Sequence, residues 1–388
     1  MSTIIKYGSS GAWLTYNGNV LNGNALTIPA NTMRFRFTSA QTQSSLSGVG
    51  SSGTWAKVSD YVWDYTYTGG SWGREFYYPY ESELLPSCDV VGSNISSNDD
   101  MYGLFYGQEN IQTIYLNTAH GLTSAFSDCT SLTSVRFDSY NGMFGGTLNT
   151  VQSFEVGTWT GMQTDQLIAP ACTYFHVGEY LGSTAYPQML SHIGSAQTPC
   201  TVIIDSMPNA TYITEIAQGG TGLGTVYLGN TRSIIDARNA FEGCSSLTQV
   251  HIADMSHVVS TRYMFDGCTS LQTCPAFDLS SCSNMEHMFV NCTSLTSCPE
   301  FTVNYELLGQ SGEAAVRSMY SGCTSLTSGA FDWYYSLSGD TSAYYNVYHH
   351  APPEPTYSFP YNPSSITLMF ASASSTETGW PYISITWK

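Results

Sequence analysis

The chain has 388 residues, and only 10% of them are charged, against about 25% in an average soluble domain. Acidic residues outnumber basic ones 29 to 11, which gives a net charge of -18. Because this charge repels nucleic acids and anionic membrane surfaces, we expect neither as a partner. There is no run of about 18 apolar residues that could span a membrane, and the first residues lack the pattern of a signal peptide. We therefore expect a protein that is made in a cytoplasm and is not exported by such a signal.

Residues 1–95 predict a small β-rich N-terminal domain. In the segment 26–39, apolar side chains alternate with arginines, which is typical of a strand. A dense aromatic stretch at 61–80 is interrupted by Gly69 and Gly70, which predicts a hairpin. We expect this domain to cap the rest of the chain or to dock it on a partner.

A phrase then recurs along the middle of the chain. YMFDGCTSLQTCPAF begins at Tyr263, and HMFVNCTSLTSCPEF begins at His287, 24 residues later. Weaker copies begin at Ala125, Ala240 and Ser318. A fixed period in the twenties indicates a solenoid, in which each coil buries its apolar face against its neighbours.

Each copy carries the same apolar pattern after the C-T-S or C-S-S part of the phrase. An anchor residue is followed by apolar residues three and five positions later, as in Leu132, Val135 and Phe137, which predicts a short strand. Degenerate copies extend the array to about ten coils over residues 96–337, with anchors at 111, 132, 151, 172, 199, 223, 247, 271, 295 and 326. We predict a β-rich leucine-rich-repeat solenoid with one strand and one short helical turn per coil. The strands are expected at 111–116, 132–137, 151–156, 172–177, 223–228, 247–252, 271–277 and 295–301.

Residues 338–388 predict a C-terminal cap that is rich in aromatic residues and proline. The segment closes with the apolar sequences SITLMF and ISITW, which indicate one or two capping strands. A solenoid needs such caps because its end coils would otherwise expose their core.

Some repeated residues are expected to stack in columns inside the solenoid. Phe265 and Phe289 recur in register and should pack between coils. Five of the eleven cysteines occupy one slot and should form a ladder of buried, reduced thiols that behave as small hydrophobes: Cys129, Cys244, Cys268, Cys292 and Cys323. Because these segments lack C-x-x-C pairs and nearby histidines, we expect no metal site, and nothing else indicates a cofactor.

The phrase M-F-x-x-C-T-S-L-T-S-x-P-x-F, at Tyr263–Phe277 and His287–Phe301, resembles the BspA-like leucine-rich repeats of bacterial surface proteins. The resemblance implies a curved right-handed solenoid and adhesion to host matrix, to other cells or to surface sugars. Similar arrays occur in structural proteins of phages that infect gut bacteria. The chain shows no signal peptide, sorting tail or lipobox cysteine, which favours a virion part over a secreted surface protein.

Strand residues that point away from the core should form one continuous face. Tyrosine and histidine rings can stack on sugars or fit peptide side chains at a low cost in entropy. The alternative is that these are ordinary solvent-facing residues, since tyrosine and threonine favour strands. The ligand candidates on this face are Tyr115, Arg136, Tyr174, His176, Tyr227 and His251.

The sequence predicts no enzyme and no catalytic residues. It contains no G-x-S-x-G, no H-E-x-x-H and no phosphate loop. A glycan depolymerase would need two carboxylates about 5–10 Å apart on one face, and Glu155 is the single acidic residue among the expected outward positions. His349 and His350 are adjacent on an extended chain, so they point in opposite directions and should not chelate a metal together.

We therefore expect a non-enzymatic bacteriophage virion component: a head or tail fibre, a decoration protein or a receptor-binding protein. Its N-terminal domain would bind other virion proteins, and its solenoid would present a face to a glycan or protein of the host surface, as a monomer or a homo-oligomer. It would be located in the virion, after assembly in the host cytoplasm. The alternative is an adhesin of the same repeat family on a bacterial cell surface, and a third interpretation is a glycan depolymerase.

Overall fold

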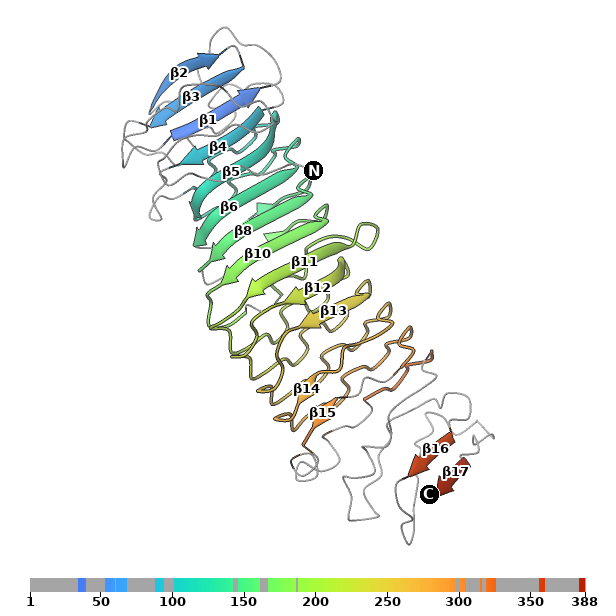
Figure 1. The fold of residues 1–388 in the computed structure, drawn as a ribbon. Coiled ribbons are helices and arrows are strands. Elements are labelled where there is room, and N and C mark those ends of the chain that lie inside the picture. The colour runs from blue at the N-terminus through green and yellow to red at the C-terminus, as the bar shows by residue number, and fades with distance from the viewer. Residues whose placement is uncertain are drawn as a thin grey trace.

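The computed structural model shows an elongated stack of coils (Figure 1). It describes residues 34–39, 53–59, 61–67, 88–93, 101–141, 146–160, 167–185, 188–297, 301–304, 307, 315, 319–325, 356–359 and 384–387. The predicted β-rich solenoid is confirmed in this part of the chain.

One sheet of 11 strands runs along the stack, in the order β13-β12-β11-β10-β8-β6-β5-β4-β1-β3-β2. Each coil contributes one strand, and neighbouring strands from β4 to β13 are parallel. Six of the eight predicted strands are present, and β4 and β11 join them. The parallel strands are β4 Cys88–Ser93, β5 Ile111–His120, β6 Ser134–Asn141, β8 Ser153–Trp159, β10 Tyr174–Tyr180, β11 Cys200–Ser206, β12 Leu223–Leu228 and β13 Gln249–Ile252.

The alternation of apolar and polar residues sets the register of this sheet. Ile114, Val135 and Phe154 pair directly across three strands and are buried, while the residues on either side of them point outward. A slip of one residue would expose every one of these apolar side chains, so burial specifies the register.

Most predicted anchors are buried at the start of their coils. One is displaced: Pro199 is exposed, and Cys200 takes its place opposite Leu223. The register shifts by one residue after Cys200, because this coil is entered one position late. The anchor at 326 lies outside the described residues. The buried anchors are Ile111, Leu132, Val151, Cys172, Leu223, Leu247, Leu271 and Leu295.

The described strands of the N-terminal region extend the solenoid sheet. β1 Arg34–Ser39 pairs antiparallel with β4, β3 Val62–Tyr67 pairs with β1, and β2 Gly53–Ser59 forms the end of the sheet. A hairpin joins β2 to β3, at a position that the sequence analysis did not predict. The turn predicted at Gly69 and Gly70 lies outside the described residues, and the domain boundary at residue 95 stays a prediction.

The short helical turns predicted opposite the strands are wrong. Residues 101–297 contain no helix where the structure describes them. In the coil at 261–268, the N–H groups of Tyr263 and Phe265 donate to the carbonyls of Glu286 and Met288 in the next coil. The N–H group of Met264, between them, donates to the carbonyl of Thr261 in its own coil. An α-helix would direct all these N–H groups along its own axis, so bonding between coils replaces it with a series of turns.

Two positions of this turn segment have left-handed backbone geometry. Tyr263 has φ +56° and Gly267 has φ +74°, a region that an α-helix does not use. The second position recurs in the same slot as Gly219, Gly243 and Gly322.

Two predicted strands in the late coils are also wrong. Residues 271–277 form no strand, and the described residues of 295–301 form none of more than one residue. Pro275 lies within the first of these segments and has no N–H group to donate to a neighbouring strand. Two-residue strands, β14 Asp278–Leu279 and β15 Thr302–Val303, pair there instead.

Stacked aromatic rings and thiols connect successive coils inside the stack. The ring of Phe265 lies 5.6 Å from Phe241 and 5.3 Å from Phe289, nearly parallel to both. The thiol of Cys268 donates to the carbonyl of Phe241 in the preceding coil at 3.1 Å. Cys129, Cys244, Cys292 and Cys323 make the same bond to the preceding coil. All five are buried and form no disulfide.

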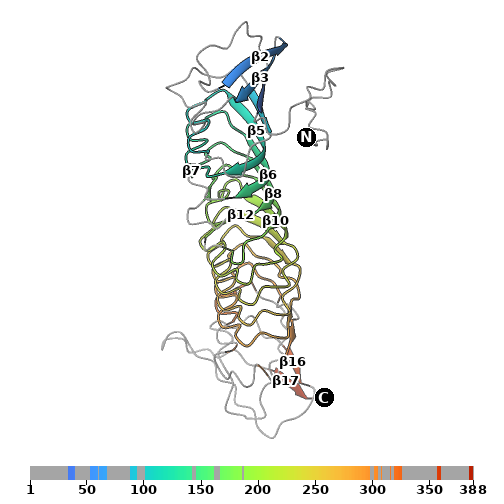
Figure 2. The same ribbon diagram turned by 90° about the vertical axis from the view of Figure 1, so that its left-hand side faces the viewer.

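Short strand pairs lie outside the main sheet. β7 Gly146–Thr147 pairs with β9 Leu167–Ile168, across the coils from β6 and β8 (Figure 2). In the region of the predicted cap, β16 Thr356–Phe359 pairs with β17 Ser384–Trp387, and the rest of that region lies outside the described residues. In the part of the chain that the structure describes, no helix is long and apolar enough to cross a membrane.

Candidate functional site

Five of the six ligand candidates lie in one row across the outward face of the sheet. Consecutive register pairs join the members of this row from strand to strand. We call it the outward row, and its members are Tyr115, Arg136, Glu155, His176, Ile203, Tyr227 and His251. The sixth candidate, Tyr174, lies two residues before His176 on β10, in the neighbouring row.

Hydrogen bonds and an ion pair hold the first half of the outward row. The Tyr115 hydroxyl donates to the Asp138 carboxylate. Arg136 Nη1 lies 3.1 Å from Glu155 Oε2, and its guanidinium carbon is 6.0 Å from the centre of the Tyr115 ring. These contacts fix side chains that would otherwise be free to rotate, so this half of the row is ordered before any ligand arrives.

In the middle of the row, the imidazole of His176 lies next to a carboxylate and a phenol from the neighbouring rows. His176 Nε2 lies 2.8 Å from Asp205 Oδ2, and the Tyr174 ring centre is 6.1 Å from that of His176. Tyr174 is 36% exposed. Partial burial and the charges of Glu155 and Asp205 raise the pKa of Tyr174 above its usual value, so its hydroxyl stays protonated and can donate a hydrogen bond.

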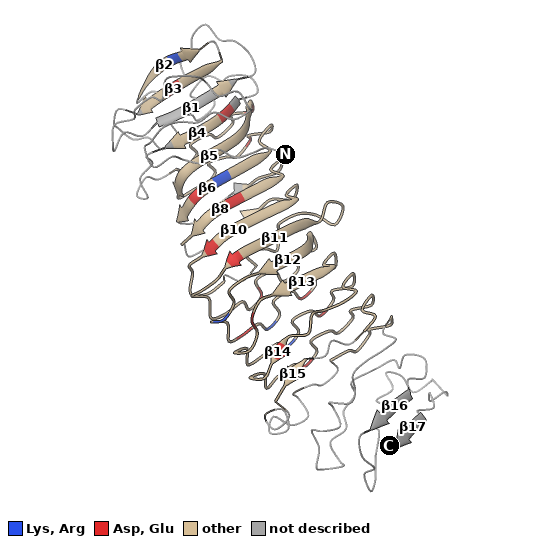
Figure 3. Cartoon of the chain, in the orientation of Figure 1, with Lys and Arg blue, Asp and Glu red and all other residues tan. Residues whose placement is uncertain are grey.

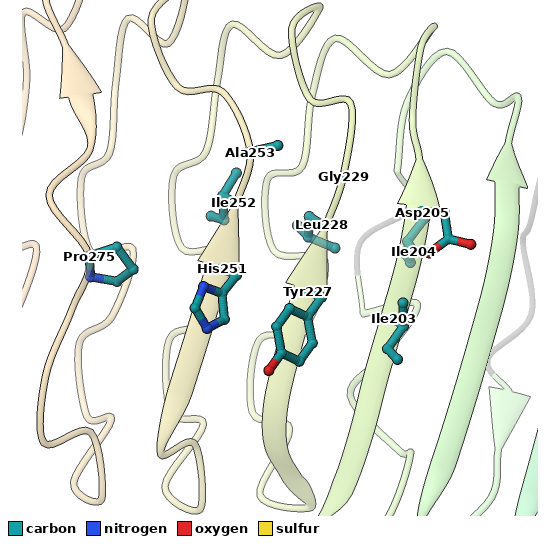
Figure 4. A pocket seen from close by; sticks show the side chains of 10 residues that line it. All are labelled: Ile203, Ile204, Asp205, Tyr227, Leu228, Gly229, His251, Ile252, Ala253 and Pro275. Carbon is teal, nitrogen blue, oxygen red and sulfur yellow. The ribbon is translucent and has the colours of Figure 1, made fainter.

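At the far end of the row, two rings stack on each other. The rings of Tyr227 and His251 lie 4.6 Å apart at an angle of 3°, and Tyr227 is 37% exposed. An open hollow of about 480 Å³ lies beside them. Figure 4 shows this hollow with the two rings side by side, Ile203 and Pro275 at either end of them, and Asp205 and Gly229 along the adjoining edge.

A strip of glycines runs beside the outward row, two residues further along three of the strands. A Cβ atom on Gly157, Gly178 or Gly229 would lie 2.5, 2.6 or 2.2 Å from a carbonyl oxygen of the preceding coil. The close approach of the coils therefore requires glycine there and leaves the strip without side chains. The sequence analysis missed this strip, although glycine recurs two positions after Glu155, His176 and Tyr227.

The outward face carries more acidic residues than the sequence analysis expected. Asp89 accepts a hydrogen bond from Thr113, and burial raises the pKa of Asp89. Asp138 and Asp205 contact Tyr115 and His176, and Glu179 lies near the end of β10 (Figure 3). Asp138 was missed because β6 continues beyond the predicted segment, and Asp89 and Asp205 were missed because β4 and β11 were not among the predicted strands. A scarcity of carboxylates on this face is therefore no argument against a depolymerase.

The ladder thiols are poor ligands and poor nucleophiles. Burial raises the pKa of Cys129 and of Cys244 to about 12, so both stay protonated near neutral pH. Cys172 and Cys200 form a separate pair with their Sγ atoms 3.8 Å apart. Among the described residues, no group of three histidine, cysteine or acidic side chains is arranged to hold a metal ion.

A pair of neighbouring carboxylates lies on the turn side of the coils. Glu242 accepts a hydrogen bond from Gln218 at 2.7 Å, and Asp266 follows it in the next coil, where it bonds to Asn291. Partial burial and the charge of Glu242 raise the pKa of Asp266 to about 6. We assign no ligand to this pair. Because the pKa of Asp266 is raised, the pair makes part of the turn side sensitive to pH.

Comparison with known proteins supports the repeat architecture and says little about function. Residues 225–333 match the model of a family described as Mycoplasma protein of unknown function, DUF285. The match covers less than half of the chain and includes the copies that are most alike. No curated protein and no solved structure matches the chain. The relation to BspA-like repeats therefore stays a resemblance.

Proposed function

We propose that this protein is a non-enzymatic virion component of a bacteriophage, a fibre, decoration or receptor-binding protein, which adheres to a host surface through the outward face of its sheet. The observation that carries the proposal is the outward row itself. Six rings or charged groups, with Ile203 among them, lie in register across seven parallel strands of one sheet.

Physical chemistry favours binding on this face. Tyrosine and histidine offer contact area with few rotatable bonds, and the strands beneath them hold their positions, so little entropy is lost on binding. Tyr174 and Tyr227 each keep more than a third of their surface exposed. The net charge of -18 disfavours an anionic polymer and leaves a neutral glycan or a protein surface as the ligand. The N-terminal region would then attach the solenoid to other virion proteins.

A bacterial cell-surface adhesin is the second candidate. The match of residues 225–333 to a family of Mycoplasma proteins favours it, because that description names a cellular source. Both candidates use the same face, so they differ in the location of the protein. Mass spectrometry of purified phage particles and of a cell-surface fraction distinguishes them.

The experiment that tests the proposed face measures attachment of labelled protein to host cells. We expect the double variant Tyr174→Ala, Tyr227→Ala to attach less well while remaining folded, because both side chains point away from the core. Tyr212→Ala is the matched control, since Tyr212 is 42% exposed on a different side of the coils. Unchanged attachment of the folded double variant would place the binding site elsewhere, in residues 1–95 or 344–361.

A further inference from the structure

We propose that the hollow beside Tyr227 and His251 is a subsite for one uncharged pyranose residue of a glycan. The inference rests on the proposed function, because the hollow is part of the same outward face. It goes further in naming the position on that face, the ligand class and the role of each group.

Tyr227 and His251 are stacked on each other, so each ring keeps one face that the other does not cover and that an apolar ligand surface can contact. Tyr227 and His251 lie 4.6 Å apart and nearly parallel, and Figure 4 shows their rings side by side along the hollow. Ile203 of the outward row and Pro275 of the next coil lie at the two ends of this pair (Figure 4). A ring-shaped ligand that contacts the uncovered face of either ring therefore meets a short side chain there and no further ring.

The backbone provides the space next to the two rings. Gly229 follows Tyr227 by two residues, and a Cβ atom there would lie 2.2 Å from the carbonyl oxygen of Asp205. The equivalent residue in the next coil is Ala253, which also lines the hollow. The volume of about 480 Å³ lies within the roughly 300–1,000 Å³ that is usual for small-molecule sites.

Asp205 supplies the polar contact at the edge of the hollow. Its side chain is 58% exposed, and its Oδ2 atom lies 2.8 Å from His176 Nε2. An ionised carboxylate has about four lone-pair positions, so Asp205 can accept hydrogen bonds from ligand hydroxyls while it stays bonded to His176. The bond to His176 also fixes the direction of the carboxylate.

These groups together fit a neutral pyranose. The C–H face of a sugar ring packs against one uncovered aromatic face, and its hydroxyls donate to a carboxylate at the rim. An acidic sugar would be repelled by Asp205, and an aromatic ligand without polar hydrogens would offer Asp205 no hydrogen bond beyond the one from His176. A lysine side chain could also approach a tyrosine ring and a carboxylate, but the bond from His176 already satisfies part of the Asp205 charge.

The test is saturation-transfer NMR on the full chain with four methyl pyranosides: the glucoside, the galactoside, the mannoside and the N-acetylglucosaminide. We expect transfer to the ring C–H protons of at least one of them. Tyr227→Ala should weaken that binding roughly tenfold, and Asp205→Asn should weaken it by a similar factor, since a stacking or hydrogen-bonding contact of this kind is lost in each. Tyr227→Phe should retain the binding because it keeps the ring, and Tyr212→Ala should not affect it.

Three results would overturn the subsite. They are an absence of transfer to every pyranoside, transfer that Tyr227→Ala leaves unchanged, and displacement of the sugar by Nα-acetyl-lysine methylamide at equal concentration. Attachment to host cells, measured in parallel, keeps this failure separate from failure of the proposed function. Cell attachment that depends on Tyr174 but not on Tyr227 would leave the outward face in place and remove the pyranose subsite.

Discussion

The two halves of the solenoid stack their coils by different means. Between β5 and β11, where the sequence repeat is degenerate, the strands of the main sheet have seven to ten residues. Between residues 253 and 304, where the phrase repeats most faithfully, the described strands have two residues. The coils that are most alike in sequence therefore contain the least sheet.

The difference arises because the first part of the repeated phrase, residues 263–271 in one copy, lies on the turn side of its coil. Its residues form the ring column of Phe241, Phe265 and Phe289, the thiol ladder and the N–H bonds between turns. The sheet depends on the residues that end the phrase and on those that follow it, and Pro275 interrupts the sheet there. Either side can hold a coil in register, and a repeated sequence does not require a continuous sheet.

Removing a ring from the column should have the largest effect. We expect Phe265→Ala to lower the free energy of unfolding by about 3–5 kcal/mol, because a fully buried ring leaves a cavity that neighbouring coils cannot fill. Denaturant unfolding measures this loss.

The two halves should also differ in hydrogen exchange. Coils after residue 253 should open before those between β5 and β11, since the late coils lack the long strands. For the Phe265→Ala variant, unchanged stability would mean that the ring column does not hold these coils.

Two glycine substitutions should separate the backbone requirements of the two sides. Gly229→Ala places a Cβ atom 2.2 Å from a carbonyl oxygen on the sheet side, and overpacking of this kind costs about 1–3 kcal/mol. Gly219→Ala on the turn side meets nothing within 4 Å, so it carries the strain of φ +75° alone, about 1 kcal/mol. Equal losses in thermal unfolding would show that the sheet side tolerates the added atom.

The acidic pair on the turn side should make stability depend weakly on pH. The pKa of Asp266 is raised to about 6, so the folded chain binds more protons than the unfolded chain between pH ~4 and 6. Its contribution to stability is therefore present at low pH and is lost as the pH rises through 6. Asp266→Asn should stabilise the protein by less than about 1 kcal/mol at pH 7, since the site is half exposed, and should have no effect at pH 4. A gain in stability of equal size at both pH values would show that it does not come from the ionisation of Asp266 next to Glu242.

The smallest expected effect concerns the number of free thiols. We expect all cysteines to be reduced in both halves, and a lower count would show that a pair on the sheet side is oxidised. Titration in denaturant without reductant should recover nearly all eleven cysteines as free thiols. Ladder thiols bond to carbonyls, whereas Cys172 and Cys200 have their sulfurs 3.8 Å apart. A deficit of two thiols would indicate a disulfide at that pair and would contradict the reduced state.

Periodicity was enough to predict what depends on residues within one coil. The anchors, the ring column at Phe265 and the common direction of Tyr115, His176 and Tyr227 all follow from side-chain alternation and a fixed spacing. These features repeat because each coil meets a neighbour like itself. The sequence therefore determined the solenoid, its buried columns and the outward row.

The tertiary structure decided what depends on the backbone of the next coil. Turns replace the expected helices because alternate N–H groups, such as that of Phe265, bond to the adjacent coil. Cys200 takes the anchor position of Pro199 because the coil enters the stack one residue late. The hollow beside Tyr227 exists because the Asp205 carbonyl comes too close for any side chain at position 229. Such contacts join residues of different coils, and the residue pattern within one coil carries no information about how closely the next one approaches.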